Sequence, residues 1–171
     1  MLRPSLPGSS ASRPTSLFLA LFALVVGGTI LLATPSAAHA QALKGKVVVS
    51  DAEFGTGFGS DADMMKAVKK QSKTTIKGEN GTWTLNLMVF LNAVPGADTI
   101  NIVYYDVSVK PRDQVNFSEV KVQPTQKIVQ VNGVSISKDL GFVKGHKYDV
   151  LATRIIGGKE KVYAKGTVTL K

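Results

Sequence analysis

The sequence predicts an all-β domain behind an N-terminal leader. From residue 44 onward, short apolar stretches either alternate with polar residues or consist of β-branched residues, and glycine, proline, asparagine and aspartate separate them. One stretch of helical character, near residues 61–70, interrupts this pattern. Strands are expected at residues 44–50, 74–77, 83–91, 99–109, 116–122, 127–137, 147–154 and 161–170.

Residues 1–40 have the features of a secretory signal peptide. Two arginines precede a charge-free apolar run over residues 17–33, which is followed by Pro35 and the small-residue motif at residues 38–40. The run has nearly the length of a bilayer span, so a retained membrane anchor is the alternative to cleavage. Because Pro35 ends the apolar helix just before the motif, cleavage is favoured. The expected product is residues 41–171, a single periplasmic or extracellular domain without a transmembrane span.

Composition restricts the chemistry of this domain. The chain has no cysteine, which excludes thiol nucleophiles, iron-sulfur clusters and cysteine-ligated zinc, and leaves packing alone to stabilise an exported protein. Without the two leader arginines, 19 basic residues stand against 12 acidic ones, a net charge of +7. This excess favours anionic partners, although a lysine-rich solvated surface is the simpler interpretation.

The helical segment places its charges favourably. Ser60 is a suitable N-cap, acidic residues occupy the first turn, and lysines follow toward the end. An apolar face of Met64, Met65 and Val68 predicts packing on the sheet. The lysines are candidate contacts for an anionic surface, and no nucleic acid is expected because no aromatic residues are interleaved with them. These candidates are Lys66, Lys69, Lys70 and Lys73.

The strand at residues 83–91 is apolar on both faces. Its odd-numbered positions, from Trp83 to Leu91, share one face, and Met88 and Phe90 lie on the other. The first face predicts a core strand with Trp83 inside. The apolar face of the helix is the expected cover for the second face. If the helix lies elsewhere, Met88 and Phe90 become a candidate partner-binding patch.

The turns and neighbouring residues give further expectations. Asn80-Gly81, Pro95-Gly96 and Gly157-Gly158 predict tight reversals, and Asn132-Gly133 predicts either a hairpin turn or a bulge. The adjacent Tyr104 and Tyr105 must point to opposite faces of their strand, so one of them is expected to face outward.

Motifs with catalytic or ligand-binding potential are weak. The glycine-rich segment at residues 55–60 departs from the dinucleotide-binding spacing, and the nearby acids Asp51, Glu53, Asp61 and Asp63 do not match a calcium loop. No cofactor and no metal are therefore predicted. His146 is the only histidine after cleavage, and a surface position is the simpler interpretation than a Ser-His-Asp site. In both S-x-x-K strings, Ser118 to Lys121 and Ser135 to Lys138, residues three apart on a strand face opposite sides.

The segment at residues 142–152 resembles the tyrosine corner of immunoglobulin-like and fibronectin-type-III-like domains. Gly145 and Tyr148 match that turn, Phe142 stands in for its leucine, and Lys144 departs from its proline. The resemblance implies an antiparallel β-sandwich of seven or eight strands, in which Trp83, Gly145 and Tyr148 are structural residues. The chain is also similar to uncharacterised exported single-domain proteins of bacteria.

The function predicted from these features is that of a non-catalytic binding or structural module. Two alternatives remain open at this point. One is a secreted hydrolase that uses a pair of carboxylates. The other is a protein-interaction module that accepts a strand at an exposed sheet edge, with an exported or cell-surface protein as partner.

Overall fold

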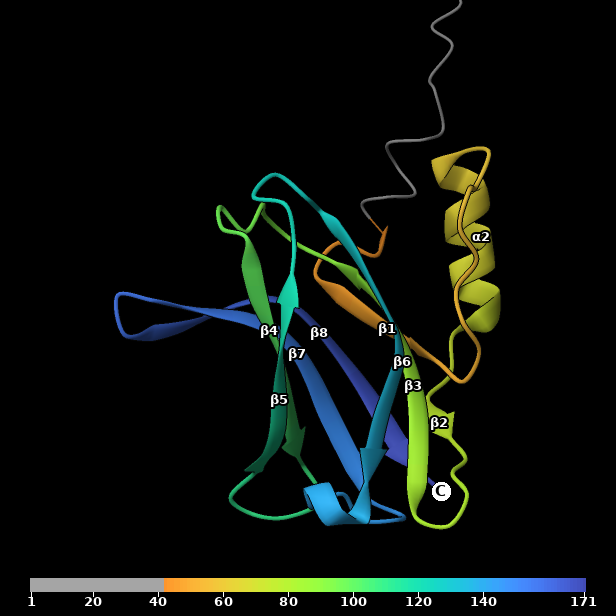
Figure 1. Cartoon of the computed structure of the whole chain (residues 1–171), viewed down its shortest axis with the longest axis vertical. Coiled ribbons are helices and arrows are strands. Elements are labelled where there is room, and N and C mark those ends of the chain that lie inside the picture. The colour runs from red at the N-terminus through yellow and green to blue at the C-terminus, as the bar shows by residue number, and fades with distance from the viewer. Residues whose placement is uncertain (1–41) are drawn as a thin grey trace, which may run out of the picture. The chain divides into compact units, whose positions relative to one another are not determined.

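The computed structural model describes residues 42–171, so the predicted leader lies outside the described residues. Within them, eight strands, one α-helix and one short 3-10 helix follow one another along the chain (Figure 1). None of these helices combines the length and the apolar character that a bilayer crossing requires. The elements are β1 (Lys46–Ser50), α2 (Asp61–Gln71), β2 (Thr75–Ile76), β3 (Thr82–Phe90), β4 (Thr99–Asp106), β5 (Asp113–Lys121), β6 (Ile128–Ser137), η1 (Lys138–Leu140), β7 (Lys147–Ile156) and β8 (Lys159–Leu170).

All eight strands belong to one sheet, which curls nearly into a barrel (Figure 1). The strand order is β5-β4-β7-β8-β1-β3-β6, and β2 pairs with β8 beside this path. Most neighbours are antiparallel, whereas β1 and β2 both pair with β8 in parallel. The all-β class and the single α-helix are confirmed. The immunoglobulin-like sandwich stays a prediction, because the described strands form one continuous sheet.

The interior of the curled sheet is filled by the inward-facing residues of every long strand. On β3 these are the predicted odd-numbered positions, and Trp83 is 1% exposed. The indole Nε1 of Trp83 donates a hydrogen bond of 3.0 Å to the carbonyl oxygen of Lys171. Tyr104 also lies in this core while Tyr105 is half-buried on the other face, as their alternation predicts. Trp83 therefore lies in the core, as the alternation along its strand predicts.

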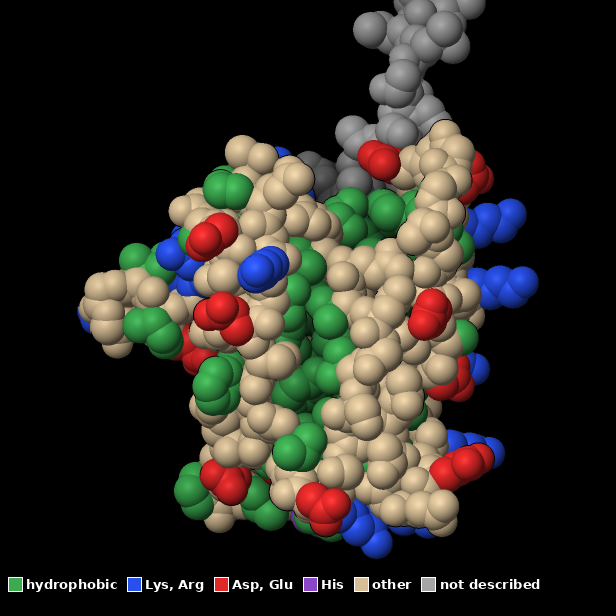
Figure 2. Space-filling model, viewed as in Figure 1, with side chains coloured by type: hydrophobic (Ala, Val, Ile, Leu, Met, Phe, Trp, Pro, Cys, Tyr) green, Lys and Arg blue, Asp and Glu red, His purple; other side chains and the backbone are tan. Residues whose placement is uncertain are grey.

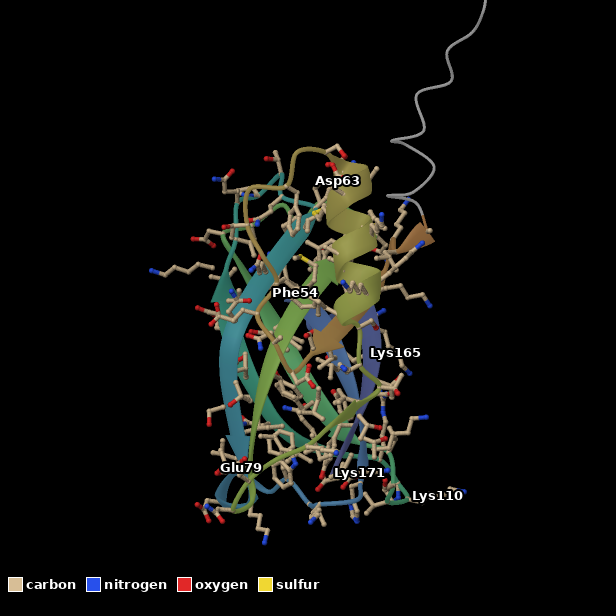
Figure 3. All side chains as sticks on the ribbon, turned by 90° about the vertical axis from the view of Figure 1, so that its right-hand side faces the viewer. Phe54, Asp63, Glu79, Lys110, Lys165 and Lys171 are labelled. Carbon is tan, nitrogen blue, oxygen red and sulfur yellow. The ribbon has the colours of Figure 1, made fainter. Side chains whose placement is uncertain are left out.

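Helix α2 covers the outer face of β1 and β3 (Figure 3). Ser60 caps the helix, because its hydroxyl accepts a hydrogen bond of 3.2 Å from the backbone N–H of Asp63. Met88 and Phe90 are 2% and 3% exposed, so they do not form an exposed patch. The docking predicted for the helix is confirmed. The outer cluster comprises Val48, Phe54, Met65, Val68, Met88 and Phe90, with Leu43, Met64 and Ile128 packed against it.

Asn132-Gly133 forms a bulge in β6 and not a hairpin turn. Leu85 of β3 pairs with Val134 and Leu87 pairs with Val131, so two residues of β6 lie opposite one residue of β3. Gly133 has a φ of 65°, a conformation that glycine adopts without strain. The side-chain carbonyl oxygen of the intervening Asn86, 2% exposed, accepts a hydrogen bond of 2.9 Å from the N–H of Gly133. The Gly133 N–H at the bulge thus has a hydrogen-bond acceptor on the neighbouring strand.

Replacing Gly78 with alanine should destabilise the fold by about 1 to 3 kcal/mol through overpacking. A Cβ atom at this position would lie 2.4 Å from both the Thr82 carbonyl oxygen and the Trp83 ring. Urea unfolding followed by the fluorescence of the single tryptophan measures the effect. Gly55→Ala is the matched control, because its Cβ would meet the Phe58 ring at an ordinary 3.8 Å. Equal unfolding midpoints for the two variants would show that the Trp83 environment tolerates displacement.

Candidate functional site

The sheet does not close between β5 and β6. These strands are consecutive in the chain, yet they lie at the two ends of the strand order, and each pairs with only one strand of the described structure. Hydrophobic side chains line a furrow along this opening (Figure 2). We call this furrow the seam. Four half-buried valines border it, Val115 and Val120 on β5 and Val131 and Val134 on β6.

Both ends of the seam are bounded by the chain itself. At one end the connection over residues 122–127 joins β5 to β6, and it is fixed by a hydrogen bond of 2.8 Å from the Leu91 N–H to the Lys127 carbonyl. At the other end, the segment after η1 crosses toward β5. A Cβ atom on Gly141 would lie 3.1 Å from Val115, and Phe142 packs edge-on against Tyr104 with ring centroids 5.5 Å apart. The seam is therefore a window of defined length in the barrel wall.

The two edges of the seam differ in chemistry. The ten residues of β6 contain neither a charged residue nor a proline, which are the usual protections of an exposed edge strand. The bulge at Asn132-Gly133 is the one protective feature that β6 carries. In contrast, β5 carries Asp113, Glu119 and Lys121. The β6 edge is thus the less protected of the two and has more capacity to pair with an added strand.

The inward-facing positions of β5 are partly polar. Asn116 pairs with Tyr104 and Ser118 pairs with Ile102, and both partners belong to the core. Because directly paired residues of an antiparallel sheet share a face, Asn116 and Ser118 point toward the interior at the seam. Both are half-buried. The seam therefore combines valines with two hydrogen-bonding side chains.

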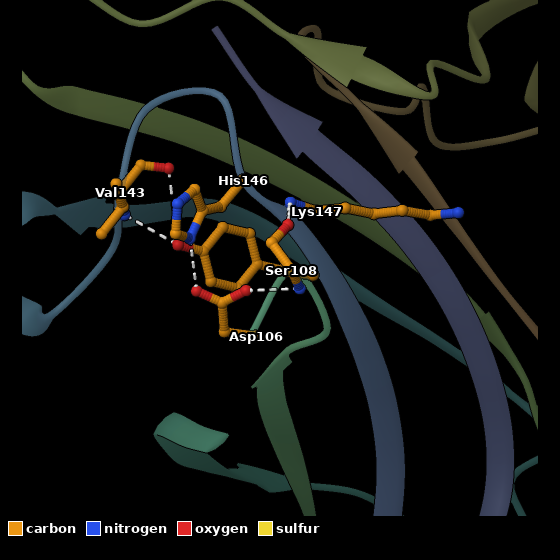
Figure 4. Close-up of polar contacts among 6 residues, drawn as sticks. Asp106, Ser108, Val143, His146 and Lys147 are labelled. Carbon is orange, nitrogen blue, oxygen red and sulfur yellow. Dashed lines mark hydrogen bonds and ion pairs between the residues drawn. The ribbon is translucent and has the colours of Figure 1, made fainter. Parts of the chain in front are cut away.

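A second cluster of polar residues surrounds Tyr148, in the segment that resembles a tyrosine corner (Figure 4). The Tyr148 hydroxyl accepts a hydrogen bond of 2.7 Å from the N–H of Val143, five residues upstream, as the resemblance to a tyrosine corner implies. His146 Nδ1 lies 2.7 Å from Asp106 Oδ2, and the other carboxylate oxygen accepts a bond of 2.8 Å from the Ser108 N–H. Burial and the nearby Asp106 carboxylate raise the pKa of Tyr148, while the bond from Val143 opposes them. Tyr148 is thus buried at the start of β7, and its structural role stays a prediction.

The Asp106–His146 pair fastens the turn before β7 to the end of β4. An aspartate-histidine pair can serve catalysis when a nucleophile contacts the second ring nitrogen, but no hydroxyl of residues 42–171 is hydrogen-bonded there. The nearest serine, Ser108, accepts a bond of 2.8 Å from the Lys147 N–H. His146 was predicted at the surface, and its side chain is 32% exposed. Its partner was not predicted, because Asp106 is 40 residues away in the sequence.

The remaining candidates are spread over the surface. Three of the predicted lysines, Lys66, Lys69 and Lys70, lie on α2, whereas Lys73 follows the helix, which ends at Gln71. All four are exposed, and Lys73 lies 4.0 Å from the Asp51 carboxylate. Across the described part of the chain, no three His, Asp or Glu side chains converge in a way that could hold a metal ion. The segment at residues 55–60 is a loop that leads into α2, with Ser60 as the N-cap. In the second S-x-x-K string, Ser135 is on β6 and Lys138 on η1.

The two buried acidic side chains each pair with one cationic or ionisable group. Asp106 pairs with His146 as described, and the Asp149 carboxylate lies 2.7 Å from Lys165 Nζ. The two groups are held in place by these contacts. A pair of free carboxylates facing each other across a cleft, as glycoside hydrolysis requires, is not formed by Asp106 and Asp149.

Comparisons with known proteins found no relative of this chain. No family model matches the chain, and no curated protein or solved structure resembles it at a significant level.

The hydroxyl of Tyr148 should stabilise the fold, whereas the hydroxyl of Tyr104 should not. Tyr148→Phe removes the acceptor of the Val143 N–H and should cost about 1 to 2 kcal/mol. Tyr104→Phe removes a buried hydroxyl that has no hydrogen-bond partner among the described residues, so it should be neutral or stabilising. Denaturant unfolding at neutral pH compares the two variants. A larger loss for Tyr104→Phe than for Tyr148→Phe would refute the importance of the corner bond.

At alkaline pH the same Tyr104→Phe variant should lose less stability than the natural chain. Burial raises the pKa of Tyr104 well above the ordinary tyrosine value of about 10, so the folded state keeps the neutral phenol while the unfolded state ionises. Below about pH 10 the phenol is neutral in both states, so its ionisation does not affect the free energy of unfolding. As the pH rises further, ionisation of the unfolded state lowers the free energy of unfolding progressively. Unfolding free energies measured at about pH 9 and about pH 11 test this difference. Equal losses in both proteins would contradict it.

Proposed function

We propose that this protein is a non-catalytic interaction module that accepts an extended polypeptide segment at the seam between β5 and β6. The observation that carries the proposal is the uncharged edge of β6, which lies directly beside a furrow of half-buried valines and pairs with no described strand. The carbonyls at its two ends, of Ile128 and Ser137, accept hydrogen bonds from Gln126 Nε2 and the Phe142 N–H, so the available edge lies between them. Edge strands of this kind present unpaired backbone N–H and C=O groups to any strand that reaches them.

Strand addition would use the two features of the seam separately. The backbone of the incoming segment would pair with the β6 edge and provide affinity that does not depend on sequence. Its alternate side chains would point into the furrow, against Val131 and Val134, and provide specificity. The ligand class is therefore a segment with apolar residues at every second position. The bulge at Asn132-Gly133 divides the edge, so pairing would be continuous only on one side of it.

The charges favour a different protein over a second copy of this chain. Two copies of the domain would each bring an excess of basic residues, 19 against 12 beyond the leader, and would repel each other at low ionic strength. Lys127 and Lys138 immediately flank β6 in the sequence. A segment with acidic residues outside its apolar core would fit these flanks best.

Export and an immunoglobulin-like origin of the fold belong to the same proposal. The leader motif, together with the absence of cysteine, is compatible with a domain that acts outside the cytoplasm and is stabilised by packing alone. The tyrosine-corner bond from Val143 to Tyr148 supports a relation to immunoglobulin-like domains. The hydrolase alternative is less favoured, because the two buried carboxylates are each engaged by His146 or Lys165.

Peptides selected from a random displayed library on the domain of residues 41–171 should carry apolar residues at alternate positions. Binding should slow the hydrogen exchange of β6 amides. Ser135→Lys places a charge on the free edge and should weaken binding by roughly threefold to fivefold, the effect of an unfavourable cross-strand neighbour. Thr84→Lys is the matched control, because Thr84 is exposed directly opposite Ser135 on the neighbouring strand β3 and should leave affinity unchanged.

Three outcomes would contradict the proposal. These are protection confined to amides outside β5 and β6, equal weakening of binding by both lysine variants, and formation of stable dimers that compete with the peptides. The last result would assign the β6 edge to self-association.

A further inference from the structure

A separate cavity lies where β3 ends, β6 begins and α2 starts. Its volume is about 540 Å³, which falls in the usual range for small-molecule sites. It lies partly on the outer side of the sheet, because its floor includes Phe90 of the outer cluster and Ile128 packed against that cluster. Phe90 is one of the residues predicted from the sequence to bind a partner. It lines this cavity even though only 3% of it is exposed.

The walls of the cavity are mainly apolar. Leu91 and Ala93 continue the chain beyond Phe90, and Val94 is 43% exposed at the opening. Leu91 is held in place by its backbone bond to Lys127, so this wall is fixed to the start of β6. Such a surface is suited to the body of an apolar ligand, whose burial contributes about 25 cal/mol for each Å² removed from water.

Three charged side chains, two positive and one negative, line the cavity. Lys44 and Lys127 are exposed lysines that line the cavity from two different segments, and Asp61 lines it from the first turn of α2. Two cations and one anion leave a net charge of +1. A single negative charge on a ligand is complementary to this rim, whereas a second one would be repelled by Asp61.

We propose that this cavity binds a small amphiphilic monoanion, such as a carboxylate on an unbranched aliphatic body. The apolar body lies along Phe90, Val94 and Ile128, and the carboxylate lies between the Lys44 and Lys127 ammonium groups. Lysine suits this task because its flexible stem follows the ligand while its charge stays in water. The site shares Lys127 with the flank proposed for strand addition, but it lies at the start of β6 and uses none of the four seam valines.

Calorimetry with decanoate, decanol and decyltrimethylammonium below their aggregation thresholds tests the proposal. Decanoate should bind at least threefold more tightly than decanol in low salt, and decyltrimethylammonium should bind most weakly. The double variant Lys44→Gln/Lys127→Gln should reduce decanoate affinity by roughly threefold to twentyfold, the range for two exposed ion pairs, and leave decanol affinity unchanged. Raising the ionic strength should shrink the preference for decanoate.

Two control variants locate the site. Lys159→Gln removes an exposed lysine of β8 that does not line the cavity, and it should have no effect. Val94→Asp places a charge at the opening and should weaken decanoate and decanol together. Ser135→Lys should not alter decanoate binding, which separates a failure of this site from a failure of the strand-binding seam.

The proposal is overturned if decanoate does not bind, or if decanoate and decanol bind equally. It is also overturned if Lys159→Gln weakens decanoate binding as much as the double variant. Vesicles of dioleoylphosphatidylglycerol provide the remaining arm. Binding to these vesicles without binding of monomeric decanoate would assign Lys44 and Lys127 to a lipid surface and would refute a site for a free amphiphile.

Discussion

The structure depends on β3, a strand that is buried on both faces, as its neighbour β1 also is. Such a strand must be buried twice, and each burial requires a different part of the chain. The inward face, centred on Trp83, is enclosed by the curled sheet, and the outward face, with Met88 and Phe90, is enclosed by α2. The helix can reach that outer face because it is inserted between β1 and β2, two short strands that both pair with β8 in parallel. The hydrogen bond from Trp83 to the Lys171 carbonyl ties this arrangement to the end of β8.

Most of these elements could be predicted from local patterns, because the form of a strand, a helix cap or a turn depends mainly on residues close together in the sequence. The alternation along β3, the N-cap at Ser60 and the opposite orientations of Tyr104 and Tyr105 are all consequences of backbone period, and the structure confirms each of them. The way the sheet curls was not accessible in this way, because strand order is decided by packing between residues far apart in the chain. The resemblance of the Tyr148 turn to an immunoglobulin-like corner correctly indicated a local bond, although a local bond does not specify how many sheets the strands form.

The candidate sites were less predictable than the fold for the same physical reason. The helix lysines were singled out because charge is visible in a sequence, whereas the free edge of β6 is visible only once its neighbours are known. The absence of charge in β6 was present in the sequence as a signal, but it is typical of a buried central strand as well as of an exposed edge that binds a partner. Likewise, the partner of His146 is Asp106 of β4, and no pattern in the sequence around Asp106 indicates that the two residues lie together.

The inward polar residues of β5 explain why the barrel stays open. If β5 paired with β6, Asn116 and Ser118 would be sealed into an interior that is otherwise built from valine, isoleucine and aromatic residues. Asn116 Oδ1 already accepts a hydrogen bond of 2.7 Å from the Phe117 N–H, so closure would bury the amide N–H groups of Asn116 and the Ser118 hydroxyl. Burying such groups without partners costs about 1 to 3 kcal/mol each and would offset much of the gain from closing the sheet. At the seam they keep access to water, and an added polypeptide strand could supply backbone groups to both. The polar pair on β5 thus opposes closure by the chain itself, and the uncharged edge of β6 is the feature on which the proposed strand addition depends.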